Sequence, residues 1–366
     1  MSSALNSTLV ILMVLHVFLA NTVFGPLQVA VELVLIGWFV VGLYKENFTR
    51  LEIILLVFYL FATLVSFFTN GLREFMLAAK VIGLGMLAAI YFTKKDVDPG
   101  RIFEWLFIVD CFLLIHQLAF GRFVFGDWVA AYGKNWATMV ASRPLGVFLN
   151  PHASSYFLAI FILYAVHKSV KLLPSLVMVF FSGSFFTFVS FLVQMIWRIL
   201  PKFVGKLAGF FLLFFIICFI VVVIVSELNP DVRDAIIDFP VYLNEDEYIS
   251  PVRVLGVQVL LGQLLSFETY ERIFTLFPRD FNAIIFDWHD DFGNELMFFT
   301  LIQHAGLPLF VVYLIYIARQ AAFFIPFIFV SLLHYGDISA PLFVYMFIMY
   351  SKLLVAAPNR WGGSKS

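Results

Sequence analysis

Hydrophobic residues in this chain form long runs that are separated by short polar stretches. A bilayer core about 30 Å thick needs about 20 apolar residues per helix, and most of the runs are close to this length. The pattern therefore predicts membrane-spanning helices over residues 6–23, 27–44, 52–69, 75–92, 102–120, 153–167, 207–226, 293–318, 321–334 and 341–357.

A further apolar run over residues 172–197 is interrupted by Ser182, Gly183 and Ser184, so its length alone does not decide between one crossing and two. Basic residues precede this run and follow it, and the positive-inside rule places both of its ends in the cytoplasm. We therefore expect two short helices that meet at the Ser-Gly-Ser break. The other basic residues then also fall inside, which predicts about 12 crossings with both termini cytoplasmic.

This topology leaves two long polar stretches on the external face, residues 121–152 and 227–292, within one membrane domain over residues 1–366. The second stretch contains four Arg, thirteen Asp or Glu and no Lys. Long loops in a chain with otherwise tight connections are more often functional than decorative. We therefore expect the functional residues to lie in these two loops.

Composition agrees with a membrane protein and argues against several other classes. Hydrophobic residues make up 62% of the chain, charged residues make up 13%, and the mean hydropathy is +0.98. A net charge of -1 and the absence of a long basic run argue against nucleic-acid binding. The sequence has no Walker A loop, dinucleotide fingerprint, H-E-x-x-H or G-x-S-x-G motif, so ATP hydrolysis, hydride transfer and the commonest protease schemes lack support.

The first external loop ends in the segment R-P-L-G-V-F-L-N-P-H, which begins at Arg143 and runs directly into the next apolar segment. Asn150 is a favourable N-cap and Pro151 suits the first helical position, so a helix is expected to begin here with its positive dipole end outward. Such an end favours the binding of anions. Arg143 can fold back toward this helix end and form a bidentate contact with a phosphate. The alternative is an exposed arginine at the level of the lipid headgroups.

The second external loop contains Arg253 at the start of an apolar segment, then Arg279, and then His289 directly before the next span. Asp290 and Asp291 follow the histidine. A neighbouring carboxylate can fix the tautomer of an imidazole and favour its protonated form, which makes His289 a candidate general base. The alternative is a solvated loop histidine. The histidines in the apolar runs have no partnering motif, and we expect structural roles for them.

Some charged residues lie inside the apolar spans, and the clear cases are Glu32, Lys80 and Asp110. Each costs roughly 3 kcal/mol or more at the centre of a bilayer unless it is paired or hydrated. Glu32 and Lys80 each lie five residues from the external ends of their helices, so the two can form an ion pair at the same depth. The alternative is that they line a substrate cavity.

The segment R-P-L-G-V-F-L-N-P-H, together with the later W-H-D-D-F-G-N-E-L-M-F-F-T-L-I-Q-H-A-G-L-P-L, resembles the bacterial O-antigen polymerase (Wzy) and O-antigen ligase (WaaL) superfamily over roughly residues 140–318. His152 stands where Asn is common in that family, and Ser182-Gly-Ser replaces the frequent Ser-Arg-Gly. The resemblance implies an all-α, polytopic membrane glycosyltransferase of the GT-C type in the bacterial inner membrane, with its active site facing the periplasm.

The resemblance also implies a donor glycan on undecaprenyl pyrophosphate and a sugar hydroxyl as acceptor, with no metal and no cofactor. Our hypothesis is that Arg143, Arg253 and Arg279 bind the pyrophosphate, helped by the amides near Asn150 and His152. His289 then deprotonates the attacking hydroxyl, and Asp290 or Asp291 orients the imidazole.

The compact chain and its acidic, Lys-free external loop favour a polymerase that joins lipid-linked repeat units. A chain-length regulator protein is a candidate partner. A ligase that transfers glycan to lipid A core remains an alternative, because it shares the donor chemistry. A lipid-linked glycan transporter or flippase and a non-catalytic scaffold are alternatives of other classes, although the chain shows no convincing internal repeat.

Overall fold

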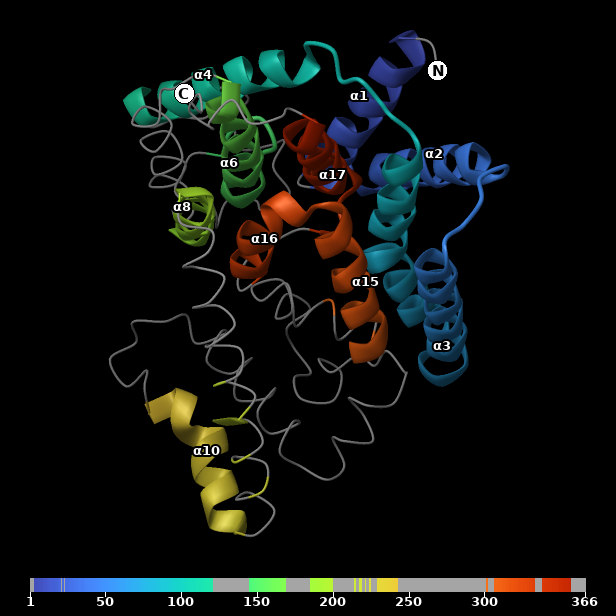
Figure 1. The fold of residues 1–366 in the computed structure, drawn as a ribbon, viewed down its shortest axis with the longest axis vertical. Coiled ribbons are helices and arrows are strands. Elements are labelled where there is room, and N and C mark those ends of the chain that lie inside the picture. The colour runs from blue at the N-terminus through green and yellow to red at the C-terminus, as the bar shows by residue number, and fades with distance from the viewer. Residues whose placement is uncertain are drawn as a thin grey trace, which may run out of the picture.

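The structure is a computed structural model that describes residues 3–120 apart from 21 and 23, together with 145–168, 185–199, 229–242, 306–332, 338–356 and a few isolated positions. Every element in this part of the chain is a helix, in agreement with the expected all-α class (Figure 1). The elements are α1 (Ser3–Ala20), α2 (Gly25–Leu43), α3 (Arg50–Lys94), α4 (Ile102–Phe120), α6 (Pro151–Lys168), α8 (Phe185–Ile199), α10 (Pro230–Tyr242), α15 (Leu307–Gln320), η2 (Ala322–Phe324), α16 (Ile325–Ser331) and α17 (Pro341–Ala356).

Three helices in the described ranges are long and apolar enough to cross a membrane, over Pro26–Leu43, Arg50–Phe68 and Ile102–Phe120. A fourth is added when Leu307–Gln320 and Ala322–Ser331, which meet at a bend of 106°, are taken as one broken span. These helices are compatible with a protein embedded in a membrane. Several of the expected spans fall wholly or partly outside the described residues, so the expected number of about 12 stays a prediction.

The segment expected to cross over residues 321–334 contains instead the short η2 turn and α16, which has only seven residues. A helix rises about 1.5 Å per residue, so α16 alone is too short to cross a hydrocarbon core of about 30 Å. The buried side chain of Gln194 forms two hydrogen bonds with the backbone at this break. It donates to Phe323 O at 2.5 Å and accepts from Phe327 N at 3.1 Å. Such partners are required wherever a helix breaks in an apolar environment.

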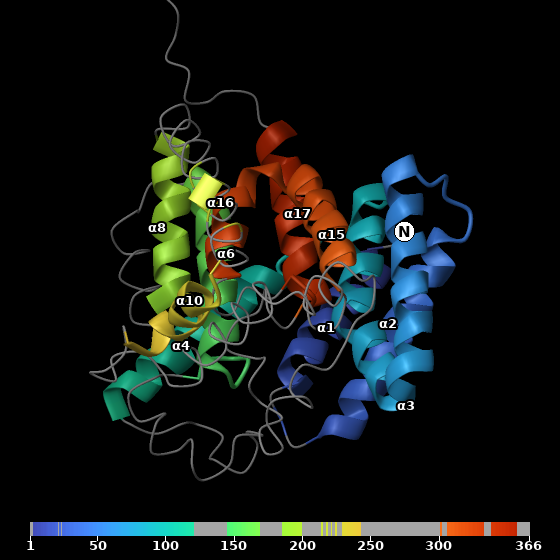
Figure 2. The same cartoon turned by 90° about the horizontal axis from the view of Figure 1, so that it is seen from below.

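Helix α3 has helical structure over 45 residues, yet its two ends lie side by side. The Nζ atom of Lys94 is 2.9 Å from Oε2 of Glu52, whereas a straight helix of this length separates its ends by about 65 Å. The rings of Phe67 and Phe75 lie 5.6 Å apart, which places the reversal between them. Helix α3 is therefore a hairpin whose two arms correspond to the two separate segments expected here (Figure 2).

The base of this hairpin is closed around one buried carboxylate. Glu52 is 1% exposed, and its Oε2 atom accepts from Thr49 N at 2.6 Å and pairs with Lys94. The hydroxyl of Tyr316 donates to the other oxygen, Oε1, at 3.1 Å. Glu52 therefore caps the first arm, joins it to the second arm and ties both to α15.

Helix α17 lies at the centre of the bundle, and its residues 342–348 are at most 1% exposed. It packs against α1, α3, α6 and α15 (Figures 1 and 2). Near its C-terminus, Lys352 donates to Phe92 O and Thr93 O at 2.9 and 3.1 Å, which satisfies carbonyls in the last turn of α3. Large apolar side chains are instead exposed along α2, α3 and α4, as expected for surfaces that face lipid.

Segments that the charge pattern assigns to the cytoplasm contact one another in pairs. Lys95, after α3, pairs with Glu46, after α2. Arg198, near the end of α8, donates to Leu163 O near the end of α6 at 3.1 Å. Each pair places its two helix ends next to each other, and the side of a membrane on which they lie stays a prediction.

We expect Lys94→Met to destabilise the protein by about 3 kcal/mol or more, because it leaves the buried Glu52 carboxylate without its cation. The measurement is the free energy of unfolding of the purified protein in detergent. Lys95→Met is the matched control. Its partner Glu46 is partly exposed, so its loss is expected to stay within about 1 kcal/mol. Equal losses in the two variants contradict the role given to Glu52.

Candidate functional site

Residues 145–150 form a turn that leads directly into α6. The side-chain oxygen of Asn150 accepts from His152 N at 2.8 Å and from Ala153 N at 3.2 Å. Pro151 occupies the first helical position, where its missing N–H is no loss. The predicted N-cap and helix start are therefore confirmed.

This cap defines what the N-terminus of α6 offers to an anion. The first available amides, those of His152 and Ala153, already donate to Asn150, which is 4% exposed. A phosphate at this end gains the field of the helix dipole. To form hydrogen bonds with these amides, the phosphate would have to displace the side-chain oxygen of Asn150. The turn thus provides a favourable electrostatic position rather than a set of open donors.

Two side chains of α4 accept hydrogen bonds from backbone amides of the turn. Val147 N donates to Oδ1 of Asp110 at 2.6 Å, and Leu145 N donates to Oε1 of Gln117 at 2.8 Å. Asp110 is fully buried and Gln117 is 7% exposed. The intramembrane carboxylate noted in the sequence is therefore a backbone acceptor for this turn.

The turn is also fixed from α6 and is strained. Ser154 Oγ donates to Leu145 O at 2.9 Å and accepts from Phe148 N at 3.3 Å. Gly146 and Leu149 have φ values of 63° and 55°, in the left-handed region. A bulky residue such as leucine rarely adopts this conformation, which costs on the order of 1–3 kcal/mol and persists only when the surroundings enforce it.

Of the predicted site, the structure describes Asn150 and His152, and it places both at the start of α6. The other predicted site residues lie outside the described residues. They are Arg143, Arg253, Arg279, His289, Asp290 and Asp291. Their roles stay predictions.

A second polar cluster lies between α1, α2 and the second arm of α3. Lys80 Nζ is 3.1 Å from Oε1 of Glu32, so the predicted ion pair is confirmed. His16 Nε2 and Gln28 Nε2 reach the same oxygen at 3.1 and 2.9 Å. Sequence reasoning gave His16 no partner, because only the packing of α1 against α2 brings it to Glu32.

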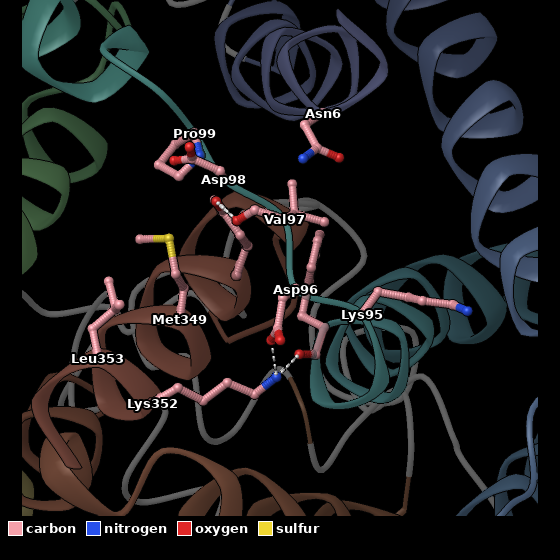
Figure 3. A pocket seen from close by; sticks show the side chains of 11 residues that line it. Asn6, Lys95, Asp96, Val97, Asp98, Pro99, Met349, Lys352 and Leu353 are labelled. Carbon is pink, nitrogen blue, oxygen red and sulfur yellow. Dashed lines mark hydrogen bonds and ion pairs between the residues drawn. The ribbon is translucent and has the colours of Figure 1, made fainter. Parts of the chain in front are cut away.

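A cavity of about 280 Å³ opens beside the connection between α3 and α4, at the end assigned to the cytoplasm (Figure 3). In its lining, Lys352 pairs with Asp96 at 2.9 Å, and α1 contributes Asn6. Lys95, also in the lining, pairs with Glu46. Because its charges are largely neutralised by neighbours, this cavity is a weaker candidate for an anionic substrate than the turn before α6.

Among the described residues, no group of three His, Cys, Asp or Glu side chains is arranged to hold a metal ion. No protein-family model, curated protein or solved structure matches this chain.

We expect Gly146→Ala to destabilise the protein by about 1–3 kcal/mol, because a Cβ there lies 2.3 Å from both Asp110 Oδ1 and Ser154 Oγ in a left-handed backbone. Thermal unfolding in detergent measures the effect. Gly37→Ala is the matched control, since nothing lies within 4 Å of its added Cβ. A neutral Gly146→Ala variant contradicts the tight packing of this turn.

Proposed function

We propose that this protein is a membrane glycosyltransferase that polymerises undecaprenyl-pyrophosphate-linked oligosaccharide repeat units, for O-antigen or capsule, at the periplasmic face of the bacterial inner membrane. The observation that supports the proposal is the turn over residues 145–150. It is buried, held by side chains of two helices and strained at Leu149. Strain that persists under such constraint occurs preferentially where function needs a fixed geometry. This turn lies within the segment that carries the resemblance to the polymerase and ligase superfamily.

The proposed reaction needs few catalytic groups, because a lipid-linked pyrophosphate is already a good leaving group. The acceptor hydroxyl oxygen attacks the anomeric carbon of the donor sugar, and the bond from that carbon to the pyrophosphate oxygen breaks. Undecaprenyl pyrophosphate leaves with the electron pair, and the hydroxyl proton passes to His289, which Asp290 orients. Arg143, Arg253 and Arg279 balance the charge of the departing diphosphate.

In this scheme the turn provides a fixed backbone next to the proposed donor site. Arg143 precedes Leu145 by two residues, so two peptide units, at most about 8 Å of chain, connect it to the fixed backbone. The N-terminus of α6 adds a favourable field for the diphosphate, and His152 lies in the first turn of that helix. A guanidinium and a helix end held at short range are suited to a diphosphate bound at the membrane surface.

We expect His289→Ala to lower glycan transfer by about 10²- to 10⁴-fold, because it removes the proton acceptor. Arg143→Lys should also be impaired, because an ammonium cannot reproduce the two-pronged contact of a guanidinium. The assay combines purified protein with lipid-linked repeat units, with and without lipid A core and with a chelator. His116→Ala is the control, as this histidine packs against Phe112 and Phe120 in α4.

The products of that assay distinguish the alternatives. A ladder of longer glycans from repeat units alone supports a polymerase, whereas transfer to lipid A core indicates a ligase. A wild-type protein that forms no covalent product in any arm rules out the glycosyltransferase and favours a lipid-linked glycan transporter. Loss of the ladder with chelator contradicts a metal-independent reaction.

We expect a cysteine at Asp234, in α10, to react with a membrane-impermeant thiol reagent in intact spheroplasts. A cysteine at Asp98 should react only after permeabilisation. Both positions are exposed, so the topology alone decides their labelling. Cys111 and Cys218 are replaced first to remove background. Labelling of both positions from the same side contradicts the proposed orientation.

A further inference from the structure

A second cavity, of about 330 Å³, adjoins the cavity of about 280 Å³ shown in Figure 3. The two cavities share Asp98 and Pro99, from the connection between α3 and α4, and Met349 and Leu353 of α17. Helices α1 and α3 contribute further residues to the first cavity, and α4 and α6 contribute further residues to the second. The cavities therefore lie side by side at Asp98, at the end that the charge pattern assigns to the cytoplasm.

Both lysines in the described lining are occupied by groups of the protein. A lysine ammonium has three donors. Lys352 uses them on two carbonyls in the last turn of α3 and on Oδ1 of Asp96, at 2.9, 3.1 and 2.9 Å. Lys95 pairs with Glu46, and Figure 3 shows its side chain directed away from the other lining residues. The lysines therefore leave few donors for an anion.

Oxygen acceptors in the same lining remain available. Within the described ranges Asp98 forms no ion pair, and its Oδ1 atom accepts only from Gly100 N, at 2.9 Å. Glu104, in the first turn of α4, forms no ion pair in these ranges either. The side-chain oxygen of Asn6 is buried and has no hydrogen-bond partner in the described part of the chain. A buried acceptor without a partner is costly, so this oxygen points to a donor that is not part of the described chain.

Aromatic rings surround these acceptors. Six of them line one cavity or the other, namely Phe92, Phe103, Phe161, Tyr164, Tyr345 and Tyr350. Tyr164 and Tyr350 are stacked, with their ring centroids 3.9 Å apart and their planes 5° from parallel. The faces of aromatic rings attract ammonium groups, and carboxylates add a Coulomb attraction. Carboxylates and an unpartnered oxygen among aromatic rings suit an organic cation rather than an anion.

We infer that the two cavities at Asp98 bind an alkylammonium group. The ammonium lies against the carboxylate of Asp98, which borders both cavities, and the alkyl carbons lie against the aromatic rings. Asn6 offers a further acceptor in the first cavity, and Glu104 offers one in the second. Two sources carry this chemistry, the headgroup of an ethanolamine phospholipid and a soluble polyamine. The inference does not depend on the proposed glycosyltransferase.

The test measures binding to the full chain, purified in detergent, by native mass spectrometry. Dioctanoyl phosphatidylethanolamine presents the ammonium on a lipid, and dioctanoyl phosphatidylglycerol has the same acyl chains without it. Spermidine presents ammonium groups on a soluble molecule. Tighter binding of phosphatidylethanolamine than of phosphatidylglycerol supports the inference with the lipid headgroup as the source. Binding of spermidine without that preference supports it with a soluble amine as the source.

Asp98→Asn and Glu104→Gln each remove a negative charge with little change in size, and both positions are exposed, so the variants should fold. An exposed charge pair contributes up to about fivefold in affinity. Each single variant is therefore expected to weaken binding by about two- to fivefold, and the double variant by about tenfold. Asp234→Asn is the matched control, because this exposed carboxylate lies in α10, outside both cavities, and its change should leave binding unaltered.

A wild-type protein that binds neither phosphatidylethanolamine nor spermidine overturns the inference. Equal binding of the two lipids, with no binding of spermidine, also overturns it, because the attraction then does not come from the ammonium. A double variant that keeps wild-type affinity overturns the role of the two carboxylates and with it the site. None of these measurements involves glycan transfer, so their outcome is separate from that of the proposed function.

Discussion

Polar groups within this apolar bundle need partners, because neither lipid nor packed side chains can replace water around a charge or a broken helix. Glu52 binds a lysine side chain, a backbone amide and a tyrosine hydroxyl. Glu32 binds a lysine, a histidine and the side-chain amide of a glutamine. Gln194 forms hydrogen bonds with the backbone at a helix break, and Asp110 accepts a hydrogen bond from the backbone of a turn. Each polar residue connects segments that are distant in the sequence, so these few contacts determine how the apolar helices are arranged.

The turn before α6 differs from the other polar connections in its purpose. The contacts of Glu52 and Gln194 join helices to helices, whereas Asp110 and Gln117 act on a short strained loop at a helix start. Such support fixes the conformation of the loop. The proposed donor site gives a reason, since a diphosphate needs its cationic and dipolar partners in fixed positions before chemistry begins.

Sequence reasoning predicted the helical class, the N-cap at Asn150, the Glu32–Lys80 pair and the reversal within α3, because each depends on local rules or on helix depth. It missed His16 as a partner of Glu32, since that contact depends on how α1 packs against α2. In the described part of the crossing expected over residues 321–334, α16 is short and follows a sharp bend after α15, which was missed because hydropathy measures apolar length and does not detect a helix break. The predicted histidine and arginines of the external loops stay predictions.

The hairpin of α3 has a consequence for how the chain enters the membrane during synthesis. Its first arm is made with the Glu52 carboxylate already at its base, while the lysine that neutralises it comes only at the end of the second arm. Lys80 on that second arm likewise meets a carboxylate that was made earlier, on α2. Charge compensation is complete only when both arms are present, which favours entry of the two arms into a membrane as a pair over entry of each helix alone.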